Sequence, residues 1–318
     1  MKAPKVRIVR DYRMLLGFLA ALLLSLPANA ANWKSMAPLP VAADNAAVES
    51  INGIIYVAGG GNYVVPNSTL QAFNPETNTW TALANMPLTL YQGDGAGVIN
   101  SQLYVAGGWN GPLPTNTLLM YDPPSNTWTT LAAMSHLSAC GATGVINSKL
   151  YVTTACNGYS YPPYDNFLDV YDPVANTTWT IKAGSASAHG GPAFGVINDK
   201  LYVAGGLNGT GALTKVLEVY DPVANTWTTL AHMPAAVQFP ASVALNGKLY
   251  VFGGNNGASD VATVQVYDPH KNQWRILSCL PSALSGSSGV VVYGLAFMEG
   301  GDGSGTTNQY VAITPSIP

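Results

Sequence analysis

Histidine and carboxylate side chains are the first candidates for chemistry, because they bind metal ions and transfer protons near neutral pH. His136, His189 and His232 could supply a three-imidazole metal site, and Asp94 with Asp302 could serve acid–base chemistry. The chain has no H-E-x-x-H, no G-x-S-x-G, no EF-hand loop and no C-x-x-C. The sequence therefore carries no catalytic signature, and we expect neither a cofactor nor a metal site.

The cysteines could form a disulfide. Cys140 and Cys156 flank the turn dipeptide Asn147-Ser148 almost symmetrically, whereas Cys279 stands apart. A strict two-residue hairpin turn misses their pairing by one residue, which would put them on opposite faces of the sheet. A bulge or a longer turn would bring them together, with Cα atoms less than ~7 Å apart. A disulfide and two small buried side chains both remain open.

The elements that must position these residues repeat along the chain. Tryptophan recurs every 47 to 51 residues from Trp33 to Trp274. Between these tryptophans lie a glycine pair, such as Gly107-Gly108, and a Tyr-Asp-Pro triplet, such as Tyr121-Asp122-Pro123. Because the tryptophans are strictly periodic, we expect them to pack one repeat against the next rather than to bind a ligand.

The pattern of apolar runs and turn residues predicts four short strands in each repeat, and residues 93–130 are an example. Two apolar runs flank Asn100-Ser101, which tolerates the positive φ angles of a two-residue hairpin. A third run ends at Asp122, and a threonine-rich run surrounds Trp128. No segment has a 3.6-residue period, so the predicted class is all-β, and a four-stranded unit repeated around a ring is a β-propeller.

The order Gly-Gly, Tyr-Asp, Trp resembles the Kelch repeat over residues 33 to about 315. This resemblance implies one domain over residues 31–318, a six-bladed β-propeller of four-stranded Kelch-type blades. The third repeat departs from the pattern, with Thr154-Ala155 in place of the glycine pair. The last repeat lacks its tryptophan, and the segment around Trp33 can replace it. We therefore expect the last blade to be closed by the N-terminal strand.

The same resemblance places ligands on the face that carries two loop classes, one between the second and third strands and one between blades. These loops do not repeat in sequence, and they mix aromatic, amide, hydroxyl and carboxylate groups. That mixture suits a sugar, a protein contact, or exposed loops with no ligand. The histidines enter by separate loops that fan out around the ring. We predict ligand-binding residues around the channel mouth at Tyr63, Tyr91, Gln92, Asp94, Trp109, Asn110, Tyr159, Tyr161, His189 and Gln238.

Composition and the N-terminus limit the function classes further. Charged residues make up 9% of the chain and its formal net charge is −3, which argues against a nucleic-acid partner. Residues 1–30 combine a basic start, a short apolar run and Ala28-Asn29-Ala30, which is typical of a secretory signal peptide. The run is too short to span a bilayer. We expect an exported monomer, periplasmic or extracellular, without stable membrane insertion once the signal is cleaved. An uncleaved anchor is the alternative.

Two functions remain open after the sequence has been read. The first is a non-catalytic protein- or glycan-binding module that uses the variable loop face and takes no cofactor. The alternative, implied by the Kelch resemblance, is a carbohydrate-active enzyme of the sialic-acid epimerase (mutarotase) type on the same propeller. A deep pocket with convergent polar groups and a perturbed acid would favour the enzyme, and a broad shallow face would favour the binding module.

Overall fold

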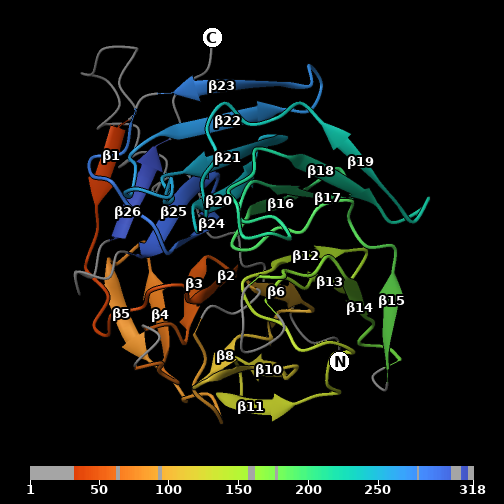
Figure 1. Cartoon of the computed structure of the whole chain (residues 1–318). Helices are drawn as coiled ribbons and strands as arrows, with labels where there is room; N and C mark the ends of the chain where they lie inside the picture. The colour runs from red at the N-terminus through yellow and green to blue at the C-terminus, as the bar shows by residue number, and fades with distance from the viewer. Residues whose placement is uncertain are drawn as a thin grey trace, which may run out of the picture.

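The computed structural model of the chain describes residues 32–61, 65–91, 95–156, 162–175, 178–277, 279–301 and 309–313. All regular elements in these ranges are β-strands, arranged as small sheets around a common centre (Figure 1). Among the described residues there is no helix with the length and apolarity needed to cross a membrane. The predicted signal peptide, residues 1–30, lies outside the described residues.

Five blades are each formed by one continuous stretch of chain, with four antiparallel strands in each. The first contains β2 (Ala47–Ile51), β3 (Ile54–Ala58), β4 (Leu70–Asn74) and β5 (Thr79–Ala82). The second contains β6 (Gly95–Ile99), β7 (Gln102–Ala106), β10 (Leu118–Asp122) and β11 (Thr127–Thr130), with β8 (Trp109–Asn110) and β9 (Leu113–Pro114) forming a small separate ribbon. The third contains β12 (Ala142–Ile146), β13 (Lys149–Thr153), β14 (Leu168–Tyr171) and β15 (Trp179–Lys182).

The fourth blade contains β16 (Ala193–Ile197), β17 (Lys200–Ala204), β18 (Leu217–Asp221) and β19 (Thr226–Leu230). The fifth contains β20 (Ala241–Leu245), β21 (Lys248–Phe252), β22 (Val264–Asp268) and β23 (Gln273–Leu277). The remaining strands are β24 (Ser287–Val292), β25 (Leu295–Gly300), β26 (Gln309–Ile313) and β1 (Asn32–Ser35).

The short strands follow from turn chemistry. Asn100 and Ser101 have φ angles of 53° and 61°, so the predicted two-residue turn joins β6 to β7 with Ile99 opposite Gln102. Asn147 and Ser148 do the same between β12 and β13. These turns hold each innermost strand against its neighbour and send the strand after it outward in the blade (Figure 1).

The periodic tryptophans join successive repeats, as predicted. Trp128 on β11 stands opposite Tyr121 and packs against its ring, with ring centres 5.1 Å apart. Its indole N–H donates to the carbonyl oxygen of Ala84, in the loop before this blade, at 2.8 Å. Trp227 repeats the arrangement with Tyr220 and the Ala183 carbonyl. Each outer strand is thereby tied to the loop that enters its blade.

The ring closes through a sheet made from both ends of the described chain. β1 pairs antiparallel with β26, which confirms the predicted closure by the N-terminal strand, and the sheet order is β1-β26-β25-β24. The prediction of six Kelch-type blades is nevertheless corrected: five Kelch-type blades are present. The closing sheet is composite, and Ala312 stands opposite Trp33 where the contiguous blades have Tyr or Phe. The last repeat lacks the Tyr-Asp-Pro turn and the tryptophan strand, so it cannot complete a blade from its own sequence.

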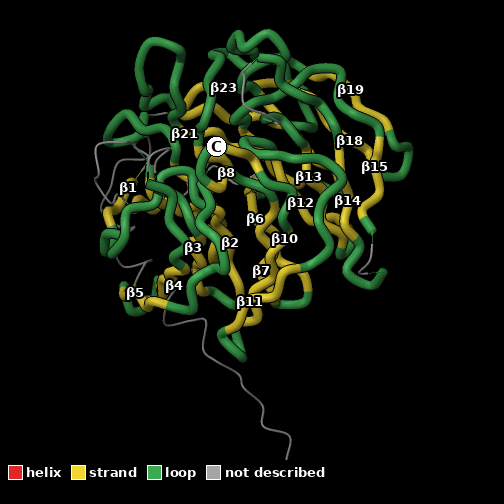
Figure 2. The backbone as a smooth tube through the Cα atoms, turned by 60° about the horizontal axis from the view of Figure 1, so that its bottom comes forward, coloured by secondary structure: helices red, strands yellow, loops and turns green. Residues whose placement is uncertain are grey.

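The innermost strands surround the centre of the ring. These are β2, β6, β12, β16, β20 and β24, each in contact with the next around the ring. Apolar clusters fill the spaces between blades, for example Tyr104 and Leu150 between the second and third. Figure 2 shows the strands from the side, with loops gathered at their ends. The core therefore lies between blades, and the centre is left as a channel.

Candidate ligand site at the mouth of the central channel

The two predicted loop classes are joined into one backbone scaffold. In the fifth blade, Gln238 and Asn255 exchange N–H···O bonds of 2.9 and 2.8 Å. The same exchange joins Tyr91 to Trp109. It recurs between Ala139 and Cys156 and between Gly190 and Leu207. In these four blades the inter-blade loop therefore extends the ladder of the inner hairpin, which fixes where the variable side chains stand.

Buried polar side chains on the third strands form hydrogen bonds with the backbone of the inter-blade loops. The second residue of the third strand is Gln71, Asp169, Glu218 or Gln265 in four blades, and all four are buried. Gln71 bonds both the N–H and the carbonyl of Val41, and Gln265 does the same with Ala235. The second blade has Leu119 at this position. These side chains satisfy loop backbone groups that burial would otherwise leave unpaired.

Two of the three candidate histidines belong to this clamp, whereas His232 is exposed. His136 Nδ1 lies 2.9 Å from Asp169 Oδ1, and its ring stacks on Phe167. His189 is buried, with Nε2 3.1 Å from Glu218 Oε2 and Nδ1 2.8 Å from the Gly205 carbonyl oxygen. Both histidines therefore hold loops. No group of three or more metal-ligating side chains occurs within the described ranges.

Burial opposes ionisation of Glu218, yet the pKa of this carboxyl is lowered. Desolvation raises the pKa, and the hydrogen bond with His189 and the N–H donors of Ser187 and Ala186 outweigh it. Glu218 is therefore a carboxylate at neutral pH. It orders the loop that leads to Gly191.

A belt of backbone hydrogen bonds forms the mouth of the channel. Gly191 N–H donates to the Cys140 carbonyl, Phe239 to Gly191, Gly286 to Phe239 and Asn45 to Gly286, at 2.6 to 2.8 Å. All five residues of this mouth belt have φ between 50° and 68°. At Gly191 a side chain would also collide with the Phe239 ring, so glycine serves both the backbone and the packing. The belt links neighbouring repeats and spans the chain closure between Gly286 and Asn45.

Of the two alternatives left open for Cys140 and Cys156, the disulfide is present, with Cα atoms 5.9 Å apart, within the predicted ~7 Å. The strict register continues past the turn, because Ala139, not Cys140, exchanges backbone hydrogen bonds with Cys156. The expected bulge is therefore absent. Instead, the left-handed backbone of Cys140 brings its side chain within reach of Cys156. Trp109, Tyr91, Tyr164 and Phe239 pack with the disulfide in one cluster.

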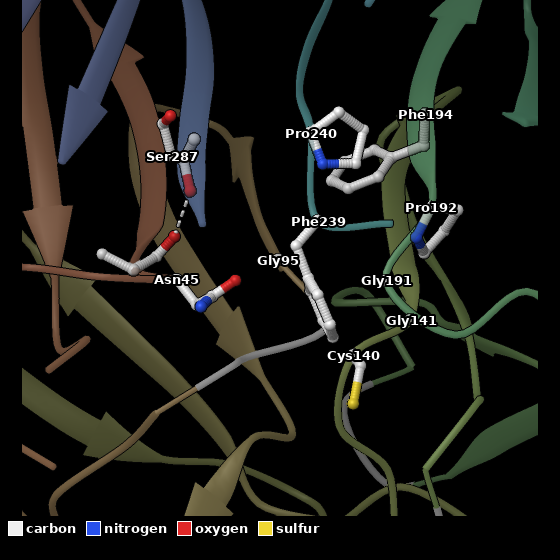
Figure 3. Close-up of a pocket in the computed structure, with 12 residues that line it drawn as sticks. Asn45, Gly95, Cys140, Gly141, Gly191, Pro192, Phe194, Phe239, Pro240 and Ser287 are labelled. Carbon is white, nitrogen blue, oxygen red and sulfur yellow. Dashed lines mark hydrogen bonds between the residues drawn. The ribbon is translucent and has the colours of Figure 1, made fainter. Parts of the chain in front are cut away.

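The belt borders an open pocket with two unlike sides, whose empty space of about 450 Å³ includes open solvent. Figure 3 shows Asn45 and Ser287 on one side, and Phe194, Pro192 and Pro240 on the other. The Phe239 side chain extends into the space between them. The Ser287 hydroxyl is buried and has no hydrogen-bond partner among the described residues. The pocket is thus polar along one wall and apolar along the other.

Tyr91 adds a hydroxyl to the polar side. Burial, together with the nearby charge of Asp44, raises the pKa of Tyr91 to about 12, although a side-chain hydrogen bond with Asn45 opposes the rise. The Asn45 amide also donates to Asp44 Oδ1 at 3.0 Å. Tyr91, Asn45 and Asp44 therefore form one polar group beside the pocket, in which Tyr91 stays a neutral hydroxyl.

The predicted site residues are distributed unevenly around this pocket. Tyr91 lies beside its polar wall, and Gln238 precedes the belt residue Phe239. Trp109 is only 7% exposed and packs against the disulfide, so a ligand would reach only its edge. Asn110 is exposed and bonds Thr89. The predicted residues Tyr63, Gln92, Asp94, Tyr159 and Tyr161 lie outside the described residues, as does Asp302.

Sequence reasoning missed the belt residues Asn45 and Phe239 and the lining residues Phe194 and Ser287. The sequence could have indicated Asn45 and Phe239, because each stands at the same position just before an innermost strand. Sequence reasoning also missed Glu49 on β2, which lines a second cavity deeper in the channel, with an empty space of about 800 Å³ that includes open solvent.

Comparison with known proteins agrees with this architecture. The sequence model of the Attractin/LZTR1 beta-propeller family matches residues 55–263, more than half of the chain. Kelch-like protein 21 from Homo sapiens and from Bos taurus is 33% identical over 84 residues, 26% of this chain. The chain spans 14% of the length of these curated relatives.

A solved structure, "Structure of YjhT", has a similar fold. It superposes with a TM-score of 0.74 at 20% identity, covering 87% of this chain and 95% of that one. The Kelch order of motifs, the blade topology and the family match agree with one another. The chain belongs to the Attractin/LZTR1 beta-propeller family and has a Kelch-type propeller fold.

Proposed function

We propose that the protein is an exported, non-catalytic glycan-binding module, and that the mouth pocket receives a neutral sugar residue. The observation that carries the proposal is the division of the pocket into a polar and an apolar wall. A pyranose has a face of C–H groups and a rim of hydroxyls. The C–H face would stack on Phe239, and the hydroxyls would pair with Asn45 and Ser287.

The charge of the pocket supports a neutral sugar over an acidic one. The residues that line it include no Lys, Arg or His, and Asp44 stands close to the polar wall. A sugar carboxylate would therefore meet a carboxylate and no positive side chain among these lining residues. The same argument disfavours the sialic-acid epimerase alternative at this pocket. A protein partner would be a second kind of ligand, and it becomes an outcome of the test.

The rigidity of the mouth also supports a binding role. The belt, the disulfide and the loop ladders fix the pocket before any ligand arrives. A preformed pocket loses little conformational entropy on binding. Export, proposed from residues 1–30, supports both the disulfide and access to external glycans. Edman sequencing of the protein from a fractionated native host tests export, and a mature N-terminus at Ala31 is expected.

A glycan array followed by calorimetry tests the binding proposal. We expect neutral glycans to bind, and Phe239→Ala to weaken binding at least tenfold, the cost of removing an aromatic anchor. Phe167→Ala is the matched control, since Phe167 is also on a loop but stacks on His136 away from the pocket. Equal losses in both variants, or binding only to sialylated glycans, would contradict the proposal. Capture of a protein ligand that still binds Phe239→Ala would point elsewhere on the face.

A further inference from the structure

The second cavity lies on the channel axis and does not depend on the proposed sugar site. Phe194 lines both cavities. Its ring reaches from β16 to β6, where a Cβ added to Gly95 would stand 3.3 Å from Cζ. Phe194 thus stands between the mouth pocket and the deeper space. The inner strands form the walls of that space, and Glu49 is the only charged side chain among the residues that line it.

Glu49 is exceptional among its equivalents. On each innermost strand, the residue three positions before the hairpin turn stands opposite an aromatic residue of the second strand, and Glu49 stands opposite Tyr56. The other five equivalents are Gly97, Gly144, Gly195, Val243 and Val290. Three are glycines because the next inner strand packs there; a Cβ on Gly97 would collide with Val145. A carboxyl at this level is therefore a property of this one position.

Most of the residues that line the cavity with the carboxyl are apolar, and Thr143 and Ser242 are the polar ones. Val98, Val145, Val196 and Val291 line the cavity with it. The nearby hydroxyl of Ser50 donates to the Val291 carbonyl oxygen at 3.1 Å. The Ser242 hydroxyl is hydrogen-bonded to the backbone of Phe194. The Glu49 carboxylate accepts a 3.2 Å bond from the Ser50 N–H.

No cation offsets this carboxylate among the strands packed against β2. Those strands are β3, β6, β7 and β24. Their titratable residues are Tyr56 on β3 and Tyr104 on β7, and β6 and β24 have none. Burial raises the pKa of Glu49 to about 7, and the Ser50 hydrogen bond opposes that rise. Glu49 therefore titrates near neutral pH, and no cationic side chain on these strands pairs with its carboxylate.

We propose that this cavity binds a primary alkylammonium ion, with the ammonium on Glu49 and the alkyl chain against the surrounding valines. The ammonium supplies the positive charge and the donors that the carboxylate lacks. The valines favour an alkyl chain, by up to about fourfold in affinity for each buried methylene. Because the bound ion needs the carboxylate, it competes with the proton.

Calorimetric titration of the purified protein with n-butylammonium and methylammonium chloride tests the proposal. We expect n-butylammonium to bind more tightly than methylammonium and n-butanol not to bind. With a pKa of about 7 in the free protein, the affinity for n-butylammonium should fall about tenfold from pH 8.5 to pH 6. No binding, equal affinity for the two ions, or equal affinity at the two pH values overturns the proposal.

Two carboxyl variants locate the site. Glu49→Gln should abolish binding of n-butylammonium, and Glu76→Gln, at an exposed turn acid, should leave it unchanged. Unchanged binding by Glu49→Gln overturns the proposal. If Glu49→Gln does not fold, carboxyl 13C NMR of the wild-type protein replaces it. One carboxyl titrating near pH 7 should move to lower pH with n-butylammonium, and an unmoved titration overturns the proposal. Glycan binding by the Phe239 site should be indifferent to Glu49→Gln, so the two proposals can fail separately.

Discussion

The two faces of the ring are built from the same repeats but use them differently. On the turn face, side chains recur with the backbone: Lys149–Asp172 and Lys200–Asp221 are ion pairs of the same 2.8 Å length in successive blades. On the loop face, the backbone ladders recur while the side chains change, so Trp109, Cys156 and Asn255 occupy equivalent bridges. A face whose side chains repeat serves the fold. A face that repeats only its backbone leaves its side chains free to select a ligand.

Both faces of the ring require that the ring be closed. Deleting residues 31–36 removes β1, exposes the edge of β26 and removes the Trp33 hydrogen bond to the Cys279 carbonyl. We expect a loss larger than the about 3–5 kcal/mol typical of a buried tryptophan, together with aggregation through the exposed edge. Chemical denaturation and size-exclusion chromatography measure it. A truncated protein with the parent's stability and solubility would contradict the closure.

The loop clamp should show the next largest effect. Glu218→Gln removes the charge that holds His189 and two loop N–H groups, and breaking such a buried pair costs about 3 kcal/mol. Because the folded-state pKa is lowered, the unfolded chain binds the proton first, so this stability exists above the carboxyl's ordinary pKa. The stability is lost as the pH falls through the lowered value.

Denaturation of wild type and Glu218→Gln from pH 7 to pH 3 checks the sign. The difference between their unfolding free energies should shrink as the pH falls. A difference that is constant with pH would mean that Glu218 acts by packing alone. Gln71→Glu, which adds the acid to the equivalent clamp without a histidine partner, provides a matched comparison.

In the third blade a disulfide reinforces the backbone bridge between the inter-blade loop and the inner hairpin, unlike in the other blades. Replacing both Cys140 and Cys156 with serine should cost about 3 kcal/mol, the value for a loop of this length. Free-thiol titration of the oxidised wild type should find Cys279 alone. Three reactive thiols in the exported, unreduced protein would reject the bridge.

The smallest effect is expected on the turn face. Lys200 and Asp221 are partly exposed, so solvent screens their ion pair, and Lys200→Ala should change neither the melting temperature nor glycan binding measurably. Differential scanning fluorimetry with the array glycans checks both. A loss of binding in this variant would move the ligand to the turn face.

Much of the fold could be predicted because the residues that form the turns recur in every Kelch-type repeat. Asn100-Ser101 fixes a hairpin, Tyr121-Asp122-Pro123 fixes the next turn, and Trp128 fixes the outer strand. The N-terminal closure followed from one missing tryptophan. The number of Kelch-type blades was misjudged because the last repeat was counted as a blade although its tyrosine and turn are absent.

The site was harder to predict because it depends on backbone conformation that single residues do not encode. Cys140, Phe239 and Asn45 have the same left-handed φ as Gly191. This shared backbone conformation becomes apparent only when the belt positions of the different repeats are compared. Histidine is a residue type that often contacts ligands, but His189 belongs to the buried clamp. Its partner there, Glu218, is distant in sequence. Glu49 looked like an ordinary strand residue until the ring placed it in the channel.

The difference between the two faces is tested most directly by mapping bound glycan onto the backbone. Amide chemical shifts of the 15N-labelled protein, titrated with the tightest neutral glycan from the array, give every residue a response. We expect the largest shifts at Asn45, Gly191, Phe239 and Ser287, and none at the turn residues Asp122 and Asp221. Shifts confined to those turns, or spread evenly over both faces, would contradict a ligand site at the channel mouth.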